Sequence, residues 1–207
     1  MHHPPTHSTR RQALVWLAGV STASLVKANA PGQSNDPFWQ AARQDGHVLL
    51  MRHAATVPGT GDPPNFRLGD CSTQRNLSDT GRLDARRLGE RLAREGVQLH
   101  AVYSSAWCRC VDTAVLAFDA QGHPHQVWPA LNSFFQGQGD GERQTREVID
   151  RLSRLPAGQT WALVTHQVNM TALTGEYPAM GEVFLVRPVP NAQGRLPVVA
   201  RWRSGSS

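Results

Sequence analysis

The chain has 207 residues, of which 40% are hydrophobic and 18% are charged. These figures suit one globular domain and exclude a collagen-like repeat, a coiled coil and wholesale disorder. The formal net charge is +5, but three of the cations, Arg10, Arg11 and Lys27, stand within residues 1–30, which hold no acid. Without these three, residues 31–207 carry only +2. We therefore expect no nucleic-acid partner.

The first thirty residues are organised like an export signal. Arg10 and Arg11 precede an apolar run at 13–26, and the pattern Ala-Asn-Ala at 28–30 is typical of a cleavage site. Paired arginines before such a run are typical of the twin-arginine (Tat) signal of bacterial export. The run has 14 residues, short of the roughly 20 that a membrane-spanning helix needs. We therefore predict that residues 1–30 are a cleaved signal read by the Tat export machinery. The mature protein is then periplasmic, with no stable membrane insertion; an uncleaved anchor is the alternative.

Three cysteines follow the signal: Cys71, Cys108 and Cys110. An odd count in an oxidising compartment favours one disulfide and one free thiol, with Cys71 joined to Cys108 or Cys110. Three reduced, buried thiols are the alternative. His123 and His125 form a His-x-His pair, and two histidines alone seldom bind a metal. We predict no metal site and no cofactor.

The rest of the chain alternates apolar runs with amphipathic segments. We predict strands at 47–51, 101–105, 126–131, 161–165, 183–186 and 198–202. We predict helices at 78–95, 111–118 and 142–155. The first helix has Ser78 as its N-cap and stops at Gly96. The predicted core face of the second helix consists of Val111, Ala114, Val115 and Phe118.

This alternation of strands and helices predicts an α/β fold, a three-layer α/β/α sandwich around a mostly parallel sheet. A polar lead-in segment at 31–46 precedes it, and residues 47–207 form a single domain. A stretch rich in proline and glycine at 58–64 is expected to be irregular. In such sheets, ligands bind beyond the carboxyl ends of the strands. The residues that follow each strand are therefore the first candidates for a site.

Two imidazoles and two guanidiniums follow the predicted strands. Arg52 and His53 come after the first strand, Arg109 after the second, and His166 after the fourth. Arginine forks match the oxygens of a dianionic phosphoryl group, and an imidazole nitrogen can attack phosphorus without a metal. The pattern therefore predicts a phosphoryl-transfer site at one rim of the sheet.

Four blocks of sequence surround these residues. They are Leu49-Leu50-Met51-Arg52-His53, Asn76-Leu77-Ser78 with Gly81-Arg82, Tyr103-Ser104-Ser105 with Arg109 and Thr113-Ala114, and Val164-Thr165-His166. Together they resemble the histidine phosphatase superfamily, which includes the cofactor-dependent phosphoglycerate mutases and many acid phosphatases. The resemblance implies a phosphoglycerate mutase-like fold. It also implies that His53 becomes a phosphohistidine while Arg52, Arg109 and His166 hold the phosphoryl group.

The chain departs from this resemblance at the acid that protonates the leaving oxygen. Relatives of the mutase type have a glutamate after a leucine on the strand that follows the Arg109 helix. Here that stretch reads Leu-Asn-Ser at 131–133. Glu182 is the first candidate for the general acid, with Asp140 and Glu142 behind it. Without an acid, the chain resembles the members that act on protein phosphohistidine, whose leaving nitrogen is less demanding.

These observations predict an exported, metal-independent phosphatase that hydrolyses a phosphomonoester through a phosphohistidine at His53. Its substrate is a small-molecule or envelope phosphoester. The alternative is a non-catalytic phosphate-binding or regulatory module of the same fold, which the missing glutamate permits. A mutase or phosphotransferase comes third, since it needs a phosphorylated primer and an acid. Arg75 is a candidate contact for a second anionic group, its alternative being a solvated surface arginine.

Overall fold

The computed structural model describes residues 1–2 and 32–204. Apart from Met1 and His2, the predicted export signal therefore lies outside the described residues. Within the described part, no helix is both long enough and apolar enough to cross a membrane.

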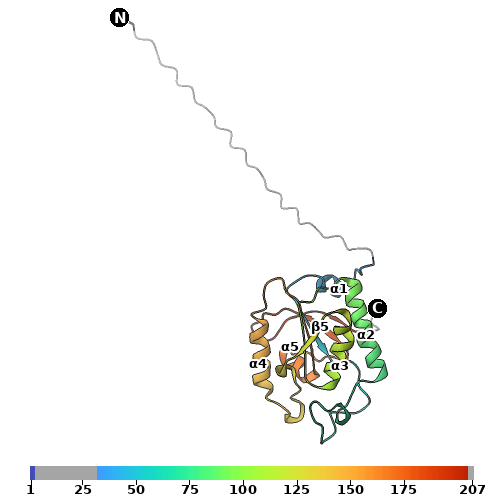
Figure 1. The fold of residues 1–207 in the computed structure, drawn as a ribbon. Coiled ribbons are helices and arrows are strands. Elements are labelled where there is room, and N and C mark those ends of the chain that lie inside the picture. Colours follow the sequence, from blue (N-terminus) through green and yellow to red (C-terminus); the bar gives the residue numbers. More distant parts are fainter. Residues whose placement is uncertain (3–31, 205–207) are drawn as a thin grey trace.

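A six-stranded sheet forms the centre of the fold (Figure 1), in the order β3-β2-β4-β1-β5-β6. Its strands are β1 (Val48–Arg52), β2 (Ala101–Ser104), β3 (His125–Val127), β4 (Trp161–Thr165), β5 (Val183–Val186) and β6 (Val198–Trp202). The strands β3, β2, β4 and β1 run parallel. The strand β5 pairs antiparallel with both β1 and β6. The predicted α/β fold with a mostly parallel sheet is confirmed.

Helices cover both faces of this sheet (Figure 1). The helices are α1 (Pro37–Ala42), α2 (Asp79–Glu95), α3 (Cys108–Ala117), α4 (Gly141–Leu152) and α5 (Gln167–Thr174). Successive side chains of a strand point to opposite faces, so Leu49 of β1 packs in a cluster with α1, α2 and α3. Its neighbour Leu50 packs in a second cluster with α4 and α5. The two clusters make the three layers, and they explain why β1 is apolar along its length.

The helix α2 begins and ends where its capping residues predict. The Ser78 hydroxyl accepts a hydrogen bond from the Gly81 backbone N–H at 3.1 Å, and Gly96 ends the helix in the left-handed conformation at φ 69°. Gly81 also lets α2 approach the loop after β1, because a Cβ there would overlap the backbone of Ala55. This close packing fixes the loop that carries the chain from β1 towards the site.

Two segments differ from the sequence-based expectation. The lead-in at 31–46 contains α1, whose Phe38 and Trp39 are buried in the core. Most of the neighbouring residues are polar, so the segment as a whole is typical of an exposed lead-in. The predicted strand at 126–131 is shorter, because β3 ends at Val127 and a 3-10 turn at Pro129–Leu131 follows. Proline at the start of that turn has no N–H for a strand ladder.

The core face of α3 is also rotated from the predicted one. Ala114 and Phe118 are buried as predicted, but Val115 is 41% exposed. Cys110 and Ala117 are fully buried instead. Ala117 faces α2, where Gly89 lies so close that a Cβ would overlap the backbone of Ala117, whereas the Cys110 thiol points to Thr165 and His166. The tight contact between the two helices selects small residues over valine.

Candidate active site

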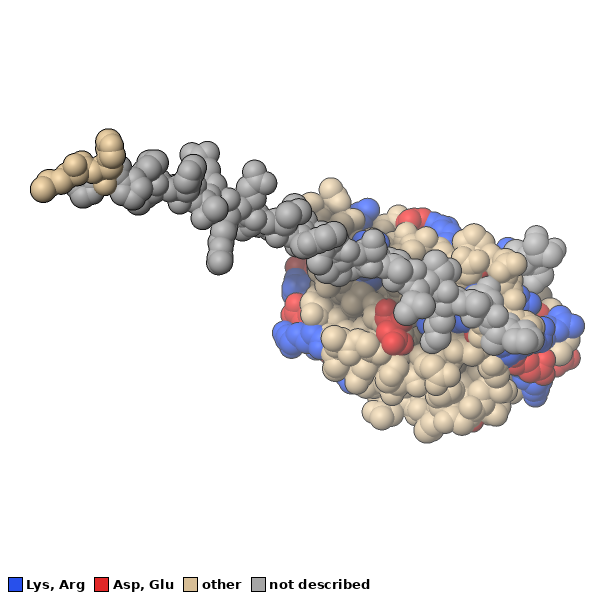
Figure 2. Space-filling model, turned by 90° about the horizontal axis from the view of Figure 1, so that it is seen from above, with Lys and Arg blue, Asp and Glu red and all other residues tan. Residues whose placement is uncertain are grey.

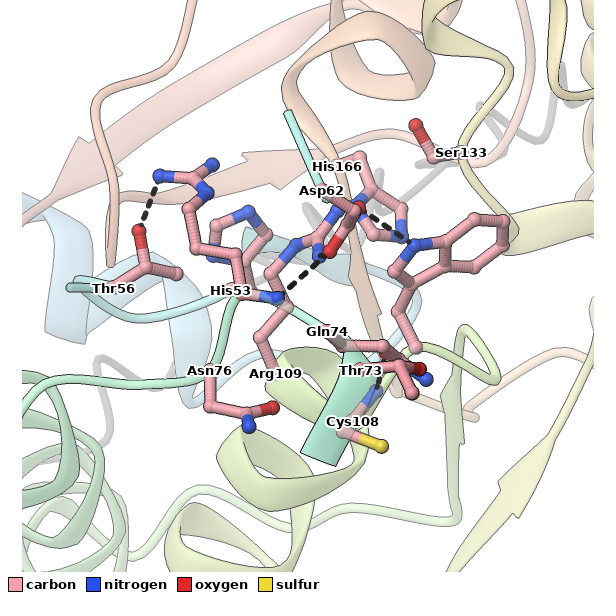
Figure 3. A network of polar contacts seen from close by, with 12 residues as sticks. His53, Thr56, Asp62, Thr73, Gln74, Asn76, Cys108, Arg109, Ser133 and His166 are labelled. Atoms are coloured by element: carbon pink, nitrogen blue, oxygen red, sulfur yellow. Dashed lines mark hydrogen bonds and ion pairs between the residues drawn. The ribbon is translucent and has the colours of Figure 1, made fainter. Parts of the chain in front are cut away.

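A cavity of about 260 Å³ opens at the carboxyl ends of β1 and β4. Arg52 ends β1 and His53 follows it, His166 follows β4, and Arg109 lies in the first turn of α3 after β2. All four side chains line the cavity, together with Asp62, which sequence reasoning did not single out. Figure 3 shows His53, Arg109, His166 and Asp62 close together. The structure therefore brings the four sequence-predicted side chains into one pocket.

His53 is buried and has a defined tautomer. Its Nδ1 lies 2.9 Å from the carbonyl oxygen of Ala54. A carbonyl can only accept, so Nδ1 carries the proton and Nε2 keeps its lone pair. Burial lowers the pKa of His53 well below its ordinary value, and the positive charge of Arg109 lowers it further. The imidazole is therefore neutral, as a nucleophile must be.

His166 belongs to a chain of hydrogen bonds. Arg109 Nη2 lies 3.4 Å from His166 Nδ1. Because a guanidinium only donates, Nδ1 accepts and Nε2–H donates to Ser105 Oγ at 2.8 Å. The Ser105 hydroxyl then donates to Asn132 Oδ1 at 3.2 Å. Burial and then the charge of Arg109 lower the pKa of His166 well below its ordinary value. Asn132, in the stretch where mutase-type relatives have their glutamate, thus holds this chain in place.

Asp62 forms the centre of a second network (Figure 3). Its Oδ1 accepts from Arg109 Nη1 at 2.7 Å and from the Arg75 backbone N–H at 3.0 Å, and its Oδ2 accepts from Trp107 Nε1 at 3.1 Å. The Arg109 and Asp62 side chains are 5% and 2% exposed. Burial alone would raise the pKa of Asp62, but these hydrogen bonds and the charge of Arg109 outweigh it and lower the pKa. Asp62 is an ionised carboxylate that fixes Arg109.

Two further guanidiniums line the cavity. Arg52 Nη1 donates to the Pro178 carbonyl at 3.0 Å. Arg75 Nη1 donates to Thr56 Oγ1 at 2.6 Å and to the Gly59 carbonyl at 2.9 Å. Burial is the main cause that lowers the pKa of both arginines, and repulsion from Arg109 contributes. The Nε atoms of Arg52, Arg75 and Arg109 are buried without a hydrogen-bond partner among the described residues. The pocket is strongly electropositive.

A disulfide anchors the loop that carries Asp62 and Arg75. Cys71 and Cys108 are bonded, with their Cα atoms 5.7 Å apart. Cys108 is the residue before Arg109, and its backbone N–H donates to Gln74 Oε1 at 2.9 Å. Cys110 is the buried free thiol, and burial raises its pKa to about 12. The prediction of one bridge and one free thiol is confirmed, and Cys108 is the partner of Cys71.

The structure does not bring Glu182 to the pocket. Its Oε2 accepts from the Ala179 backbone N–H at 2.7 Å, and its Oε1 lies 3.8 Å from Arg201 Nη1. The carboxylate thus closes the turn before β5 and does not point at His53. Asp140 is the N-cap of α4 and Glu142 is an exposed residue of its first turn. None of the three lines the cavity.

The structure places the remaining histidine candidates away from the pocket. His125 Nδ1 lies 2.8 Å from Asp119 Oδ2, and neither His125 nor His123 lines the cavity. Across residues 1–2 and 32–204, no three His, Cys, Asp or Glu side chains are grouped so that they could hold a metal ion.

Asp62 could not be found from the sequence alone. It lies in the irregular stretch at 58–64, where no strand end or helix face marks it out. Its contacts are with Arg75, Trp107 and Arg109, which come from other segments. A single sequence carries no local signal for such a contact. Arg75 was already a candidate, because it lies in the loop between the first strand and the Ser78 helix.

The sheet and the pocket define an α/β protein of the phosphoglycerate mutase-like class. Residues 48–147 match the family model of the histidine phosphatase superfamily (branch 1). Over these residues the chain is similar to the histidine phosphatase superfamily, as its four sequence blocks predict. No curated protein matches the chain.

Several solved structures share the fold. The protein histidine phosphatase SixA, complexed with tungstate, is 17% identical with a TM-score of 0.54, over 76% of this chain and 96% of that one. YhfR of Bacillus stearothermophilus is 20% identical with a TM-score of 0.55, over 74% and 95%. The alpha-ribazole phosphatase of Shigella flexneri is 18% identical with a TM-score of 0.52, over 73% and 94%. At these identities the likeness concerns the fold.

Proposed function

We propose that the protein is a metal-independent phosphatase that hydrolyses a phosphomonoester through a phosphohistidine intermediate at His53. The observation that carries this proposal is the hydrogen bond between His53 Nδ1 and the Ala54 carbonyl oxygen. It leaves Nε2 unprotonated in the pocket that Arg52, Arg109 and His166 also line. A neutral nucleophile beside several cations is the arrangement that attack on an anionic phosphoryl group needs.

In the first step, Arg52 and Arg109 bind the oxygens of the phosphoryl group, and His166 holds Arg109 in place through its Nδ1. The Nε atoms of both arginines are buried and without a partner among the described residues, and an anion would satisfy them. His53 Nε2 attacks phosphorus, and the bond to the leaving oxygen breaks with its electron pair staying on that oxygen, which takes a proton from solvent. The phosphoryl group is then bonded to the imidazole. The guanidiniums are fixed before the reaction, so they stabilise the charge of the transition state without reorganising.

In the second step, water attacks phosphorus and the P–N bond breaks, which frees inorganic phosphate and returns His53 to its neutral form. Both protons that the water brings end on phosphate or in solvent. The chemistry uses side chains of this chain alone, and we expect a chelator such as EDTA to leave the rate unchanged.

The test is turnover of p-nitrophenyl phosphate, whose leaving group needs little protonation, by the mature chain and by His53→Ala. We expect the wild-type protein to release p-nitrophenol and the variant to lose at least about a thousandfold in kcat. Binding of phosphate without any turnover by the wild-type protein would instead identify a non-catalytic module. A His123→Ala variant is the matched control, because His123 does not line the cavity.

We further propose that the protein is exported through the Tat machinery and acts in the periplasm on an envelope phosphoester. The paired arginines at 10 and 11 support this, and so does the Cys71–Cys108 disulfide, since disulfides persist in oxidising compartments. Changing Arg10 and Arg11 together to lysine should leave the full chain in the cytoplasmic fraction of a bacterial host. Equal periplasmic amounts of both forms would contradict the proposal.

A further inference from the structure

We propose that the preferred substrate ends in a diphosphate, so that the leaving group is itself a phosphate and Arg75 binds it. The bond that breaks is then a phosphoanhydride (P–O–P), whereas the proposed function names a phosphomonoester (P–O–C). This inference rests on that function and concerns the leaving side of the same pocket. Three features support it: the state of the carboxylate in the pocket, the position of Arg75, and the balance of charge.

The pocket holds no carboxyl group that is free to protonate a leaving oxygen. Among the described residues that line it, Asp62 is the only carboxylate, and it accepts hydrogen bonds from three N–H donors. Such contacts stabilise the ionised form. An alkoxide leaving group needs a proton, and the lack of a donor typically costs a hundredfold or more. A phosphate leaving group, with a second pKa of about 6, leaves as an anion and needs no acid.

Arg75 lies on the outer side of the catalytic groups. His53, Arg109 and His166 are 3%, 4% and 3% exposed, at the bottom of the pocket. Arg75 is only partly buried, and its Nη1 reaches the carbonyl of Gly59 on an exposed loop. A phosphoryl group bound at His53 therefore has its leaving group on the side where Arg75 lines the cavity.

The Arg75 guanidinium forms no ion pair with any described residue, although the nearby charge of Asp62 offsets part of its own. The Asp62 carboxylate pairs with the Arg109 guanidinium, but with Arg75 it contacts only the backbone N–H. The partners of Arg75 Nη1 are a hydroxyl and a carbonyl, which carry no charge. Its Nε is buried and has no partner among the described residues. A second phosphate would provide the missing negative charge and hydrogen-bond acceptors.

The reaction balances without another reactant. His53 Nε2 forms a bond to the terminal phosphorus, and the bond from phosphorus to the bridging oxygen breaks. That oxygen keeps the electron pair and leaves as part of a phosphate anion bound by Arg75. Water then adds to the phosphohistidine phosphorus, the P–N bond breaks with its electron pair returning to nitrogen, and one proton is released to solvent. The products are two phosphates, or one phosphate and a phosphomonoester.

The experiment compares kcat/KM for ADP, inorganic pyrophosphate, glycerol 2-phosphate and p-nitrophenyl phosphate. We expect the wild-type enzyme to prefer both anhydrides over glycerol 2-phosphate by at least about a hundredfold. Arg75→Gln should lower the ratio of kcat/KM for pyrophosphate to kcat/KM for p-nitrophenyl phosphate by at least about tenfold. Arg67→Gln is the control, because Arg67 is an exposed arginine of the same loop that pairs with Asp70.

Two results would overturn the inference. The first is an unchanged ratio in Arg75→Gln, which would mean that Arg75 does not contact the leaving group. The second is efficient turnover of glycerol 2-phosphate that is lost in Asp62→Asn while turnover of p-nitrophenyl phosphate is kept, which would make Asp62 a general acid and remove the need for an anionic leaving group. If the wild-type enzyme turns over none of the four compounds, the proposed phosphatase function itself fails. Turnover of p-nitrophenyl phosphate without a preference for anhydrides overturns only this inference.

Discussion

Single residues in this pocket set one another's charge. His53 and His166 are both buried, with ring centroids 5.6 Å apart, and the charge of Arg109 acts on each. Desolvation and the neighbouring cation disfavour the same imidazolium form, so the two effects add. Asp62 offsets part of the positive charge and holds Arg109 in position. The site thus combines two neutral imidazoles with nearby guanidinium cations. A protonated histidine would have no free lone pair on nitrogen and could not act as a nucleophile.

This electrostatic state predicts how stability depends on pH. In the unfolded chain both histidines bind a proton below a pH of about 6.5, but in the folded protein their lowered pKa values delay this. The unfolded state therefore binds more protons in that range, and the free energy of unfolding falls as the pH is lowered below about 6.5. Each histidine contributes up to about 1.4 kcal/mol per pH unit. Denaturant unfolding between pH 7 and pH 5 measures this slope.

The control for this prediction is substitution of the histidines one at a time. His53→Asn or His166→Asn should make the slope shallower, whereas His123→Asn, outside the pocket, should not. A slope that is the same in all three variants would show that the two buried histidines do not titrate as argued.

At the scale of elements, the site depends on how one loop is fastened. The segment between β1 and α2 carries Asp62 and Arg75, and it has little regular structure of its own. The Cys71–Cys108 disulfide ties it to the first turn of α3, one residue from Arg109. The contact of Asp62 with Arg109 supports the same junction. Loss of the covalent link should therefore affect both folding and the shape of the pocket.

We expect the Cys71→Ser and Cys108→Ser double variant to unfold with a free energy lower by about 3–4 kcal/mol, because the bridged residues are 37 positions apart. The KM for p-nitrophenyl phosphate should rise as the loop loses its anchor. Denaturant unfolding and steady-state kinetics measure the two effects. Treatment with a reductant should reproduce them in the wild-type protein and leave the double variant unchanged. Equal stability of the oxidised and reduced wild-type forms would contradict this role of the bridge.

The elements that sequence reasoning predicted well are those with local signals. The helix α2 has a capping serine and a terminal glycine, and β1 and β4 are continuous apolar runs. The helix α5 was not predicted, because its sequence QVNMTALT mixes polar and apolar residues without a clear face. The side chains of Asn169 and Thr174 are buried there and hydrogen-bonded to backbone carbonyls. Such burial of polar groups depends on tertiary contacts, which a local pattern does not show.

The same distinction applies to the site. Arg52 ends an apolar strand, and His53 and His166 follow directly on apolar strands, so topology alone gathers them at one edge of the sheet. Asp62 enters the pocket through a long irregular loop, and Glu182 is turned away by its contacts with the turn before β5. Strand ends can be read from a sequence, but the path of a loop cannot.

At the scale of the whole molecule, three arginines, Arg52, Arg75 and Arg109, are gathered at one cavity. On the face shown in Figure 2, basic and acidic side chains are interspersed where grey atoms do not cover it. This agrees with the formal charge of +2 for residues 31–207. The pocket lies where β1 and β4 end, next to β5, the strand at which the sheet changes from parallel to antiparallel pairing. The fold supplies the location of the pocket, and the loops after the strands complete its lining.

The most direct measurement is to trap the covalent intermediate. The mature protein is mixed with a phosphorylated substrate, quenched in base within the first turnovers, and digested for peptide mass spectrometry. The account predicts one added PO3 group on the His53 side chain that is stable in base and labile in acid, and no such group in His53→Ala. A phosphoryl group on another residue, or turnover with the imidazole of His53 never modified, would contradict it.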